Sequence, residues 1–349
     1  MLLQVRHGAG SRLKALKKEA EAFFERKASE FDADPFCINV HNGTLFIRKP
    51  GDVRTNLPLP KRARSVDPDK YVYFLPHDPA DLCTKITPVD YVPGATYERF
   101  DAFLRRVQPD DKMRRQLAAW KGYGLTGDIS EQKLSVYHGT GSNGKSVWEE
   151  VTSYIAGDYA ATVPIETFLD EGYARRAGQA TPDLARLPGV RMLRTSEPRR
   201  GAALNEALIK LATGGELMTA RHLNHPFFDF YPEFKLTVSS NYRPRIRGTD
   251  EGIWRRVDLV PWAVKITEEE KNRHLAIELR VEACPSPTGA ANAVTSRRSI
   301  TCSSSTPSTP WRTATSSGWH SSCPRARRNR PTPRSCLCLG SWLGRLAPT

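Results

Sequence analysis

One short segment of this 349-residue sequence has the residue types and spacing of a phosphate-binding loop. The pattern G-x-x-x-x-G-K-[ST] is matched by Gly139, Gly144, Lys145 and Ser146, with Thr140, Gly141, Ser142 and Asn143 between the glycines. The glycines let backbone N–H groups turn toward phosphates, the lysine reaches the β and γ phosphates, and the serine hydroxyl ligates Mg²⁺. An ordinary glycine turn is the alternative. The apolar run before the segment and the helical pattern after it favour a P-loop.

A P-loop enzyme also needs a carboxylate at the end of a neighbouring strand, to hold Mg²⁺ or to polarise the attacking water. Glu197 ends the run Val190-Arg-Met-Leu-Arg-Thr-Ser-Glu197 and is the best candidate. The strand is less apolar than usual because it contains Arg191 and Arg194, and only one acid is present. A solvated glutamate is therefore the alternative for this residue.

Two further positions could act on a bound nucleotide. Asn241 ends the run from Lys235 and could position the water beside the γ phosphate, although a lone asparagine in such a place is more often a turn residue. Arg255 and Arg256 follow Trp254, and either could reach a neighbouring subunit's nucleotide as an arginine finger. Surface arginines are the alternative for this pair.

Short apolar runs alternate with helical stretches from Lys133 onward. Strands are expected at residues 134–138, 190–195, 234–239 and 257–261, and helical stretches include 147–155, 204–211 and 266–282. This alternation predicts an α/β core over residues 126–282.

The chain ahead of this core has a different pattern. Apolar residues at helical spacing predict an amphipathic helix over residues 11–31. Residues 36–47 predict a hairpin whose two-residue loop is Asn42-Gly43 at positive φ, and residues 97–107 and 110–121 predict two helices. Residues 1–125 are therefore expected to form a mixed, mainly helical accessory domain.

The net charge of +14 is unevenly distributed. After Glu282 the chain contains no Asp, Glu or Lys but nine arginines, so residues 1–282 carry a net charge of only +5. Residues 283–349 are dominated by Ser, Thr, Pro and Arg and are expected to be a disordered tail. Two explanations are open: a frame shift near codon 283, or a natural basic tail that binds nucleic acid.

Some classes of protein are disfavoured by what the sequence lacks. No pair of cysteines has zinc-ligand spacing, and no apolar run reaches the length that crosses a membrane. The amino terminus also lacks the apolar stretch of a signal peptide. A soluble, intracellular protein without a membrane partner is therefore expected.

Taken in order, the motifs resemble the superfamily 3 helicase domain of phage and plasmid primase-helicases. The resemblance rests on GTGSNGKS, RMLRTSE, IKLATGGELMTARHL, FKLTVSSN and DEGIWRRVDLVPW. The preceding NGTL at residues 42–45 and GYGLTGD at residues 122–128 are similar to the helical domain ahead of this motor in phage and poxvirus members. The resemblance covers about residues 31–265.

This resemblance implies an AAA+-like P-loop ATPase that forms a hexameric ring and translocates on single-stranded DNA by hydrolysing ATP with Mg²⁺. In it, Lys145 and Ser146 serve the phosphates and the metal, Glu197 is the Walker B acid and second metal ligand, and Asn241 is the sensor. Arg255 or Arg256 is the finger. The family also places a DNA-gripping loop within residues 210–222, which makes Lys210, Arg221 and His222 candidate DNA contacts; a solvated helix end is the alternative there.

The resemblance also sets limits on the function. The primase half of longer relatives is not expected in this chain, so a separate primase or initiator is a possible partner, together with replication forks. An ATP-binding and DNA-binding initiator module without unwinding activity is the alternative function. A small-molecule P-loop kinase would leave Asn241 and residues 254–256 unexplained. The expected location is the host bacterial cytoplasm, with a phage, prophage or plasmid origin.

Overall fold

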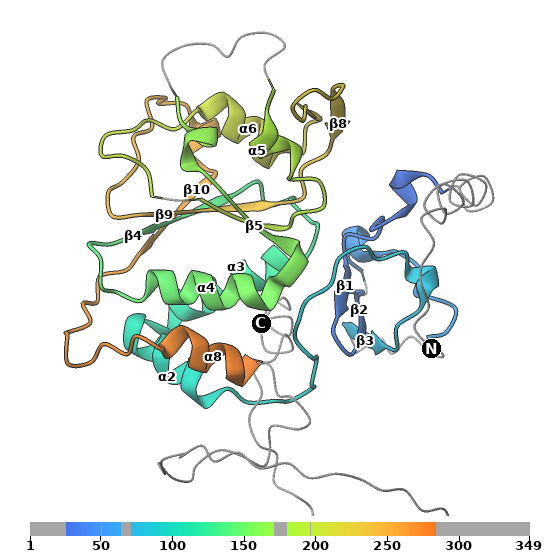
Figure 1. Ribbon diagram of the computed structural model, residues 1–349, viewed down its shortest axis with the longest axis horizontal. Helices are drawn as coiled ribbons and strands as arrows, with labels where there is room; N and C mark the ends of the chain where they lie inside the picture. The colour runs from blue at the N-terminus through green and yellow to red at the C-terminus, as the bar shows by residue number, and fades with distance from the viewer. Residues whose placement is uncertain (1–25, 50, 64–70, 171–179, 196, 284–349) are drawn as a thin grey trace, which may run out of the picture.

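The computed structural model describes residues 26–49, 51–63, 71–170, 180–195 and 197–283. They form a mixed α/β structure with a small antiparallel sheet and a larger sheet of five parallel strands (Figure 1). The tail predicted for residues 283–349, apart from Ala283, and most of the helix predicted for residues 11–31 lie outside the described residues. Within the described part of the chain, no helix is long and apolar enough to cross a membrane.

The small sheet is built from three strands in the order β1-β2-β3. Their bounds are Cys37–Val40 for β1, Gly43–Ile47 for β2 and Val72–Leu75 for β3. The predicted hairpin forms, but its loop is one residue earlier than expected: His41 and Asn42 make the turn, because Gly43 already pairs with Val40. Neither Asn42 nor Gly43 has a positive φ. Gly43 is needed for another reason, since a Cβ there would lie 2.5 Å from Cε2 of Phe74.

The large sheet has the strand order β10-β4-β9-β6-β5, and every neighbouring pair is parallel. The strands are Leu134–His138 (β4), Ala160–Val163 (β5), Met192–Thr195 (β6), Lys235–Ser240 (β9) and Val257–Pro261 (β10). β4 is buried because other strands flank it and helices cover both faces of the sheet, as is usual for parallel sheets. Four of the five strands lie where the sequence predicted a strand.

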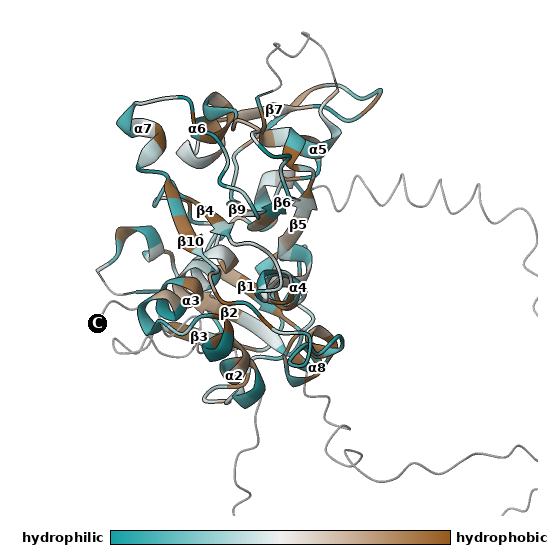
Figure 2. Cartoon of the chain, turned by 90° about the vertical axis from the view of Figure 1, so that its left-hand side faces the viewer, coloured by the Kyte–Doolittle hydropathy of each residue, from teal (hydrophilic) through white to brown (hydrophobic). Residues whose placement is uncertain are grey.

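Helices and a second hairpin cover the two faces of the large sheet (Figure 1). One face carries α2 (Glu98–Val107), α3 (Asp111–Leu125), α4 (Lys145–Ala156) and α8 (Leu275–Ala283). The other carries α5 (Pro182–Ala185), α6 (Glu206–Gly214), α7 (Glu251–Trp254) and the hairpin of β7 (Met218–Ala220) and β8 (Phe228–Phe230). Figure 2 shows the amphipathic character of this arrangement: β10 is largely brown, whereas the solvent side of α2 is teal.

The helix predicted for residues 266–282 is only partly formed. Helix α8 begins at Leu275, and the residues before it form turns instead. The N–H of Lys271 donates to the carbonyl oxygen of Glu268, and the N–H of Leu275 donates to that of Asn272. These i to i−3 bonds are those of isolated turns and not the i to i−4 bonds of an α-helix.

Helices α2 and α3 pack on the large sheet, and buried side chains of the small sheet belong to the same hydrophobic cluster. Phe100 of α2 stacks on Trp148 of α4 with ring centroids 5.6 Å apart, and Trp120 of α3 donates a 3.0 Å hydrogen bond to Thr237 of β9. Phe100, Leu117 and Trp148 belong to one buried cluster. One hydrophobic core therefore crosses residue 125, the position that the sequence suggested as a domain boundary.

Candidate functional site

The glycine-rich loop of residues 139–144 joins the carboxyl end of β4 to the amino end of α4. Gly141, Ser142 and Gly144 have φ values of 92°, 46° and 82°. These left-handed angles curl the chain, and glycine adopts them without steric cost. Gly144 is also closely packed, since a Cβ there would lie 2.6 Å from Cγ1 of Val107. The sequence motif thus corresponds to a real local requirement for glycine.

Contacts from outside the loop hold its shape. The side-chain amide of the buried Asn143 donates a 3.1 Å hydrogen bond to the carbonyl oxygen of Trp262, just beyond β10. The N–H of Ile266 donates a 2.7 Å bond to the carbonyl oxygen of Ser142. The loop is therefore fixed by the chain that leaves the neighbouring strand.

The loop has the donors that an anion needs. The N–H groups of residues 142, 143 and 144 donate none of the hydrogen bonds found among the described residues. The first turn of α4, a helix of 12 residues, adds its positive end and the exposed Ser146 hydroxyl. Unpaired backbone donors that converge at a helix N-terminus fit a phosphate group well.

Lys145 is the buried cation of the site. Its Nζ donates to the carbonyl oxygens of Gly139 at 2.5 Å and Ser240 at 3.1 Å, and to Oδ1 of Asn241 at 3.2 Å. Burial lowers the pKa of this ammonium group, and the carboxylates of Glu197 and Glu149 act in the opposite direction. Its bonds are to neutral oxygens, so an anionic phosphate would be a stronger partner than any of them.

Glu197 and Asn241 meet at the same edge of the sheet, beyond the carboxyl ends of β6 and β9. The N–H of Asn241 donates a 2.9 Å hydrogen bond to Oε1 of the exposed Glu197. Both residues line a cleft of about 1350 Å³, together with Lys145, Ser146 and residues from α2 and α8. The structure therefore brings together the predicted lysine, serine, acid and amide.

This edge of the sheet is where parallel α/β proteins bind ligands. After β4 the chain crosses to β5 at one edge of the sheet, and it later returns through β9 and β10 to the two sides of β4. Ligands bind at such a topological switch point, outside the carboxyl ends of the strands.

The two candidate finger arginines lie at the opposite end of the sheet. Both precede β10, whose first residue pairs with the first residue of β4. Arg256 is buried and donates to Oγ1 of Thr213 and to the carbonyl oxygen of Gly252. Arg255 is exposed and donates a 2.9 Å bond to Oε1 of Gln132. Neither arginine reaches the cleft of its own chain.

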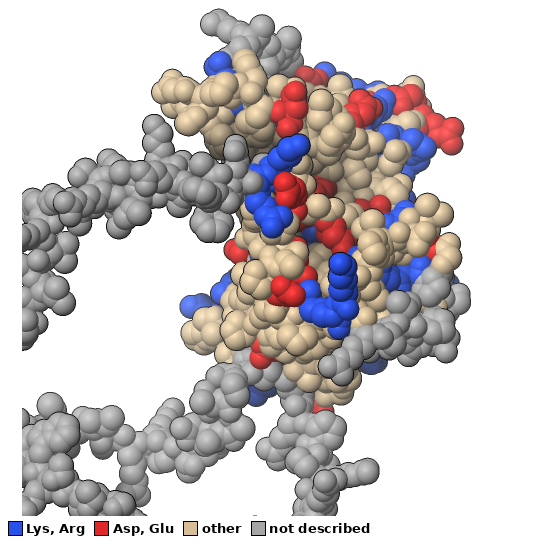
Figure 3. Space-filling model, turned by 90° about the vertical axis from the view of Figure 1, so that its right-hand side faces the viewer, with Lys and Arg blue, Asp and Glu red and all other residues tan. Residues whose placement is uncertain are grey.

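The three candidate DNA contacts are divided between two places. Arg221 and His222 follow β7 in the tip of the β7–β8 hairpin, where Arg221 lies 4.8 Å from the ring centroid of Phe227 and His222 stacks on Phe228. Lys210 lies on α6, and its Nζ forms a 2.8 Å ion pair with Asp250. The face of the molecule drawn in Figure 3 carries interspersed acidic and basic side chains and no large basic patch.

Comparison with known proteins relates this chain to one family model and to several viral proteins. Residues 5–109 match the family described as D5 N terminal like. "Putative helicase L207/L206" of Acanthamoeba polyphaga mimivirus is 30% identical over 197 residues, which are 56% of this chain and 20% of that protein. "Putative primase C962R" of African swine fever virus is 22% identical over 246 residues, which are 70% of this chain and 24% of that protein. These similarities support an assignment to the D5-type primase-helicase family.

Other similarities are more limited. "Putative helicase 022R" of Frog virus 3 is 32% identical over 165 residues, 46% of this chain and 17% of that protein. Among solved structures, the apo NrS-1 C-terminal region has a TM-score of 0.43 and 13% identity, over 56% of this chain and 44% of that one. The chain spans about a fifth of the length of the curated relatives it matches, 20% of the mimivirus protein.

Sequence reasoning missed two buried residues of opposite charge beside the cleft. Glu149, four residues after Lys145, lines the cleft and lies close to Lys121 of α3, Arg194 and Ser239. Burial raises the pKa of Glu149, whereas burial lowers the pKa of Lys121 to about 8. Both residues lie in amphipathic helices, and a charged residue in such a helix is normally expected to face solvent. No local signal could have identified the pair.

Proposed function

We propose that this chain is the ATP-hydrolysing motor of a replicative DNA helicase, built on an AAA+-like P-loop core. The convergence of Lys145, Asn241 and Glu197 beside the curled loop carries the proposal. A lysine, an amide and a carboxylate around a set of free backbone donors are what phosphoryl transfer to water requires. The names of the relatives, which include helicases and primases, agree with this assignment.

The loop would hold the nucleotide through its backbone. The N–H groups of residues 142–144 and the Nζ of Lys145 would take the phosphate oxygens, and Lys145 would exchange its bonds to neutral oxygens for bonds to charged ones. Mg²⁺, when bound, supplies a charge that stabilises the transferring phosphoryl group. Ser146 and Glu197 are the residues that would hold it, because both are exposed to the cleft and both offer oxygen.

Glu197 and Asn241 would organise the attacking water. Oε1 of Glu197 accepts the backbone N–H of Asn241, which orients the carboxylate and leaves Oε2 free to accept a proton from water. The amide of Asn241 lies next to Lys145 and can donate through its nitrogen to the same water. The two side chains act as a unit because one hydrogen bond fixes both.

We propose further that the active form is a homo-hexameric ring with sites at subunit interfaces. Arg255 is the better candidate for the arginine finger, because it is exposed and lies far from its own cleft, whereas Arg256 is buried in its own chain. Single-stranded DNA would be bound by the tip of the β7–β8 hairpin. Arg221 and His222 lie there among aromatic side chains on which bases can stack. A separate primase or initiator is a proposed partner.

Steady-state ATP hydrolysis with and without single-stranded DNA tests the proposal. The wild-type chain is expected to hydrolyse ATP with Mg²⁺, faster with DNA, and Lys145→Ala is expected to be inactive. Lys133→Ala is the matched control, since Lys133 precedes the same strand but pairs with Asp258 away from the cleft. Hydrolysis that Lys145→Ala leaves unchanged would rule the motor out. ATP and DNA binding without hydrolysis would favour the alternative function, an initiator module that does not unwind.

A further inference from the structure

A second cavity lies between the small sheet and the large one. It has a volume of about 490 Å³, and none of its lining residues also lines the nucleotide cleft. Its walls come from the small sheet, from α3 and from strands β4 and β10. Nothing in the proposed motor function uses this cavity, which we call the aromatic cavity.

Aromatic side chains from both sides line the aromatic cavity. Phe36 and Tyr71 belong to the small-sheet side, and Trp120 and Tyr123 project from α3. The α3 rings lie 6.1 Å apart between centroids, and the indole N–H of Trp120 bonds to Thr237. The hydroxyl of Tyr123 accepts the N–H of Glu131 at 3.2 Å, and the buried Nζ of Lys235 lies 5.1 Å from its ring centroid. These contacts hold both α3 rings in place without any ligand.

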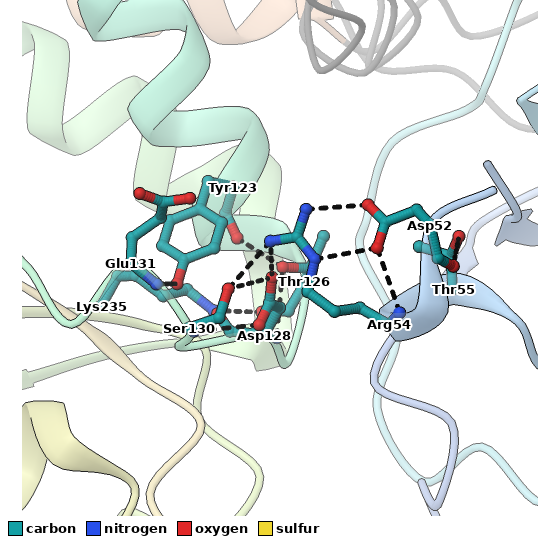
Figure 4. Close-up of polar contacts among 9 residues, drawn as sticks. All are labelled: Asp52, Arg54, Thr55, Tyr123, Thr126, Asp128, Ser130, Glu131 and Lys235. Atoms are coloured by element: carbon teal, nitrogen blue, oxygen red, sulfur yellow. Dashed lines mark hydrogen bonds and ion pairs between the residues drawn. The ribbon is translucent and has the colours of Figure 1, made fainter.

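The charged residues at the mouth of the aromatic cavity mostly neutralise one another. Arg54 reaches across from the small-sheet side and bonds to Asp52, Asp128 and Ser130 (Figure 4). Lys133 forms a 2.8 Å ion pair with Asp258. Among the described residues, Lys49 and Glu131 take part in no ion pair, and the exposed side-chain amide of Gln116 lies with them in the lining. The side chains of Lys49, Glu131 and Gln116 are therefore available to form hydrogen bonds with a polar ligand.

We propose that the aromatic cavity binds a neutral planar heteroaromatic ring of the nucleobase or nucleoside kind. Aromatic side chains in the lining can stack on a flat ring, and the amide, ammonium and carboxylate provide donors and acceptors for its edge. The volume falls within the range of small-molecule pockets. A phosphate group is disfavoured because Arg54 and Lys133 are already paired with carboxylates.

The ring can come from two sources: a free nucleoside, or a base of single-stranded DNA turned into the cavity. Base stacking on aromatic side chains is a general mode of single-strand binding, so both sources have the same chemistry. The proposal does not depend on ATP hydrolysis, since the cavity and the cleft are separate.

The test measures binding of each of the four deoxynucleosides, and of a short single-stranded oligonucleotide, by saturation-transfer NMR and calorimetry on the whole chain. Ala119→Leu fills the aromatic cavity, because Ala119 lines it from α3. Lys112→Leu makes the same kind of change on an exposed position of α3 and is the control. Tyr71→Ser removes one wall at a residue that is 41% exposed, so it should fold normally. Thermal melting checks each variant.

At least one nucleoside, or the oligonucleotide, is expected to bind on the order of tenfold more weakly to Ala119→Leu and Tyr71→Ser than to wild type and Lys112→Leu. Loss of nucleoside affinity indicates a free nucleoside as the ligand, and loss of oligonucleotide affinity alone indicates a base of the strand. Lys145→Ala should bind like wild type, which separates this site from the nucleotide cleft. Affinities unchanged in both cavity variants, or lost only in Lys145→Ala, would overturn the proposal.

Discussion

The Nζ of Lys145 lies 3.2 Å from Oδ1 of Asn241, although the two residues are 96 positions apart in the sequence. The N–H of the same asparagine bonds to Glu197. The end of β9 therefore joins the lysine of the loop to the acid beyond β6. Substitutions at these three positions should have distinct effects.

Lys145→Ala should lower the ATP hydrolysis rate by at least about 100-fold, because it removes the charge that faces the developing phosphoryl charge. The melting temperature should change little, since the bonds lost to neutral oxygens are offset by removal of a charge that burial disfavours. The rate and a circular dichroism melt measure the two effects. Lys133→Ala should match wild type in both, and a residual rate above a tenth of wild type would contradict the prediction.

Glu197→Gln should reduce ATP hydrolysis while leaving ATP binding intact. Glutamine keeps an oxygen that can accept the Asn241 N–H but cannot take a proton, so hydrolysis should fall by ~10² to 10⁴-fold while ATP binding persists. Single-turnover kinetics and equilibrium binding of a labelled nucleotide measure these effects. Loss of ATP binding together with the rate would mean that the carboxylate serves nucleotide binding alone.

Arg255→Ala and Arg256→Ala should differ in stability. Arg256 is buried and bonded to Thr213 and Gly252, so its loss leaves buried acceptors without partners and should cost about 1–3 kcal/mol of unfolding free energy. Arg255 is exposed, so its loss should leave stability unchanged and reduce only the ATPase rate of the assembled protein. Urea unfolding and ATPase assays over a range of protein concentrations distinguish the two. Equal stability losses would contradict this assignment.

Lys121 should make stability depend on alkaline pH. Its folded-state pKa of about 8 lies below the unfolded value near 10.5, so the unfolded chain binds more protons between these values. The unfolding free energy therefore rises with pH in that window, by ~3 kcal/mol at most. Lys121→Met should remove this rise. Urea unfolding of wild type and variant at pH 7.5 and pH 10 measures it, and an identical pH slope in both proteins would refute the prediction.

Arg221→Ala and His222→Ala should weaken single-stranded DNA binding more than Lys210→Ala does. The ammonium group of Lys210 forms an ion pair with Asp250, whereas Arg221 and His222 lie in the loop between β7 and β8 beside aromatic side chains on which bases can stack. Loss of one phosphate contact should also reduce the slope of log affinity against log salt by about 0.7. Fluorescence anisotropy at several salt concentrations measures both effects. A larger loss in Lys210→Ala would place the DNA on α6.

The sequence alone determined the loop at residues 139–146, four strands of the large sheet and the residue types at the strand ends. Each is encoded within a few neighbouring residues, by a turn that needs glycine or by a run of apolar side chains. The position of the hairpin turn at His41 and Asn42 was not encoded so clearly, because Gly43 is required for packing against Phe74 and not for its φ angle.

Only the tertiary structure decided which of these residues meet. It joined α2 and α3 to the core of the large sheet, buried Arg256 while leaving Arg255 exposed, and buried both Lys121 and Glu149 beside the cleft. It also enclosed the aromatic cavity between segments as distant as Tyr71 and Trp120. Such contacts depend on how the layers of the fold pack and on which charged side chains are removed from solvent. Neither produces a repeating pattern in the sequence.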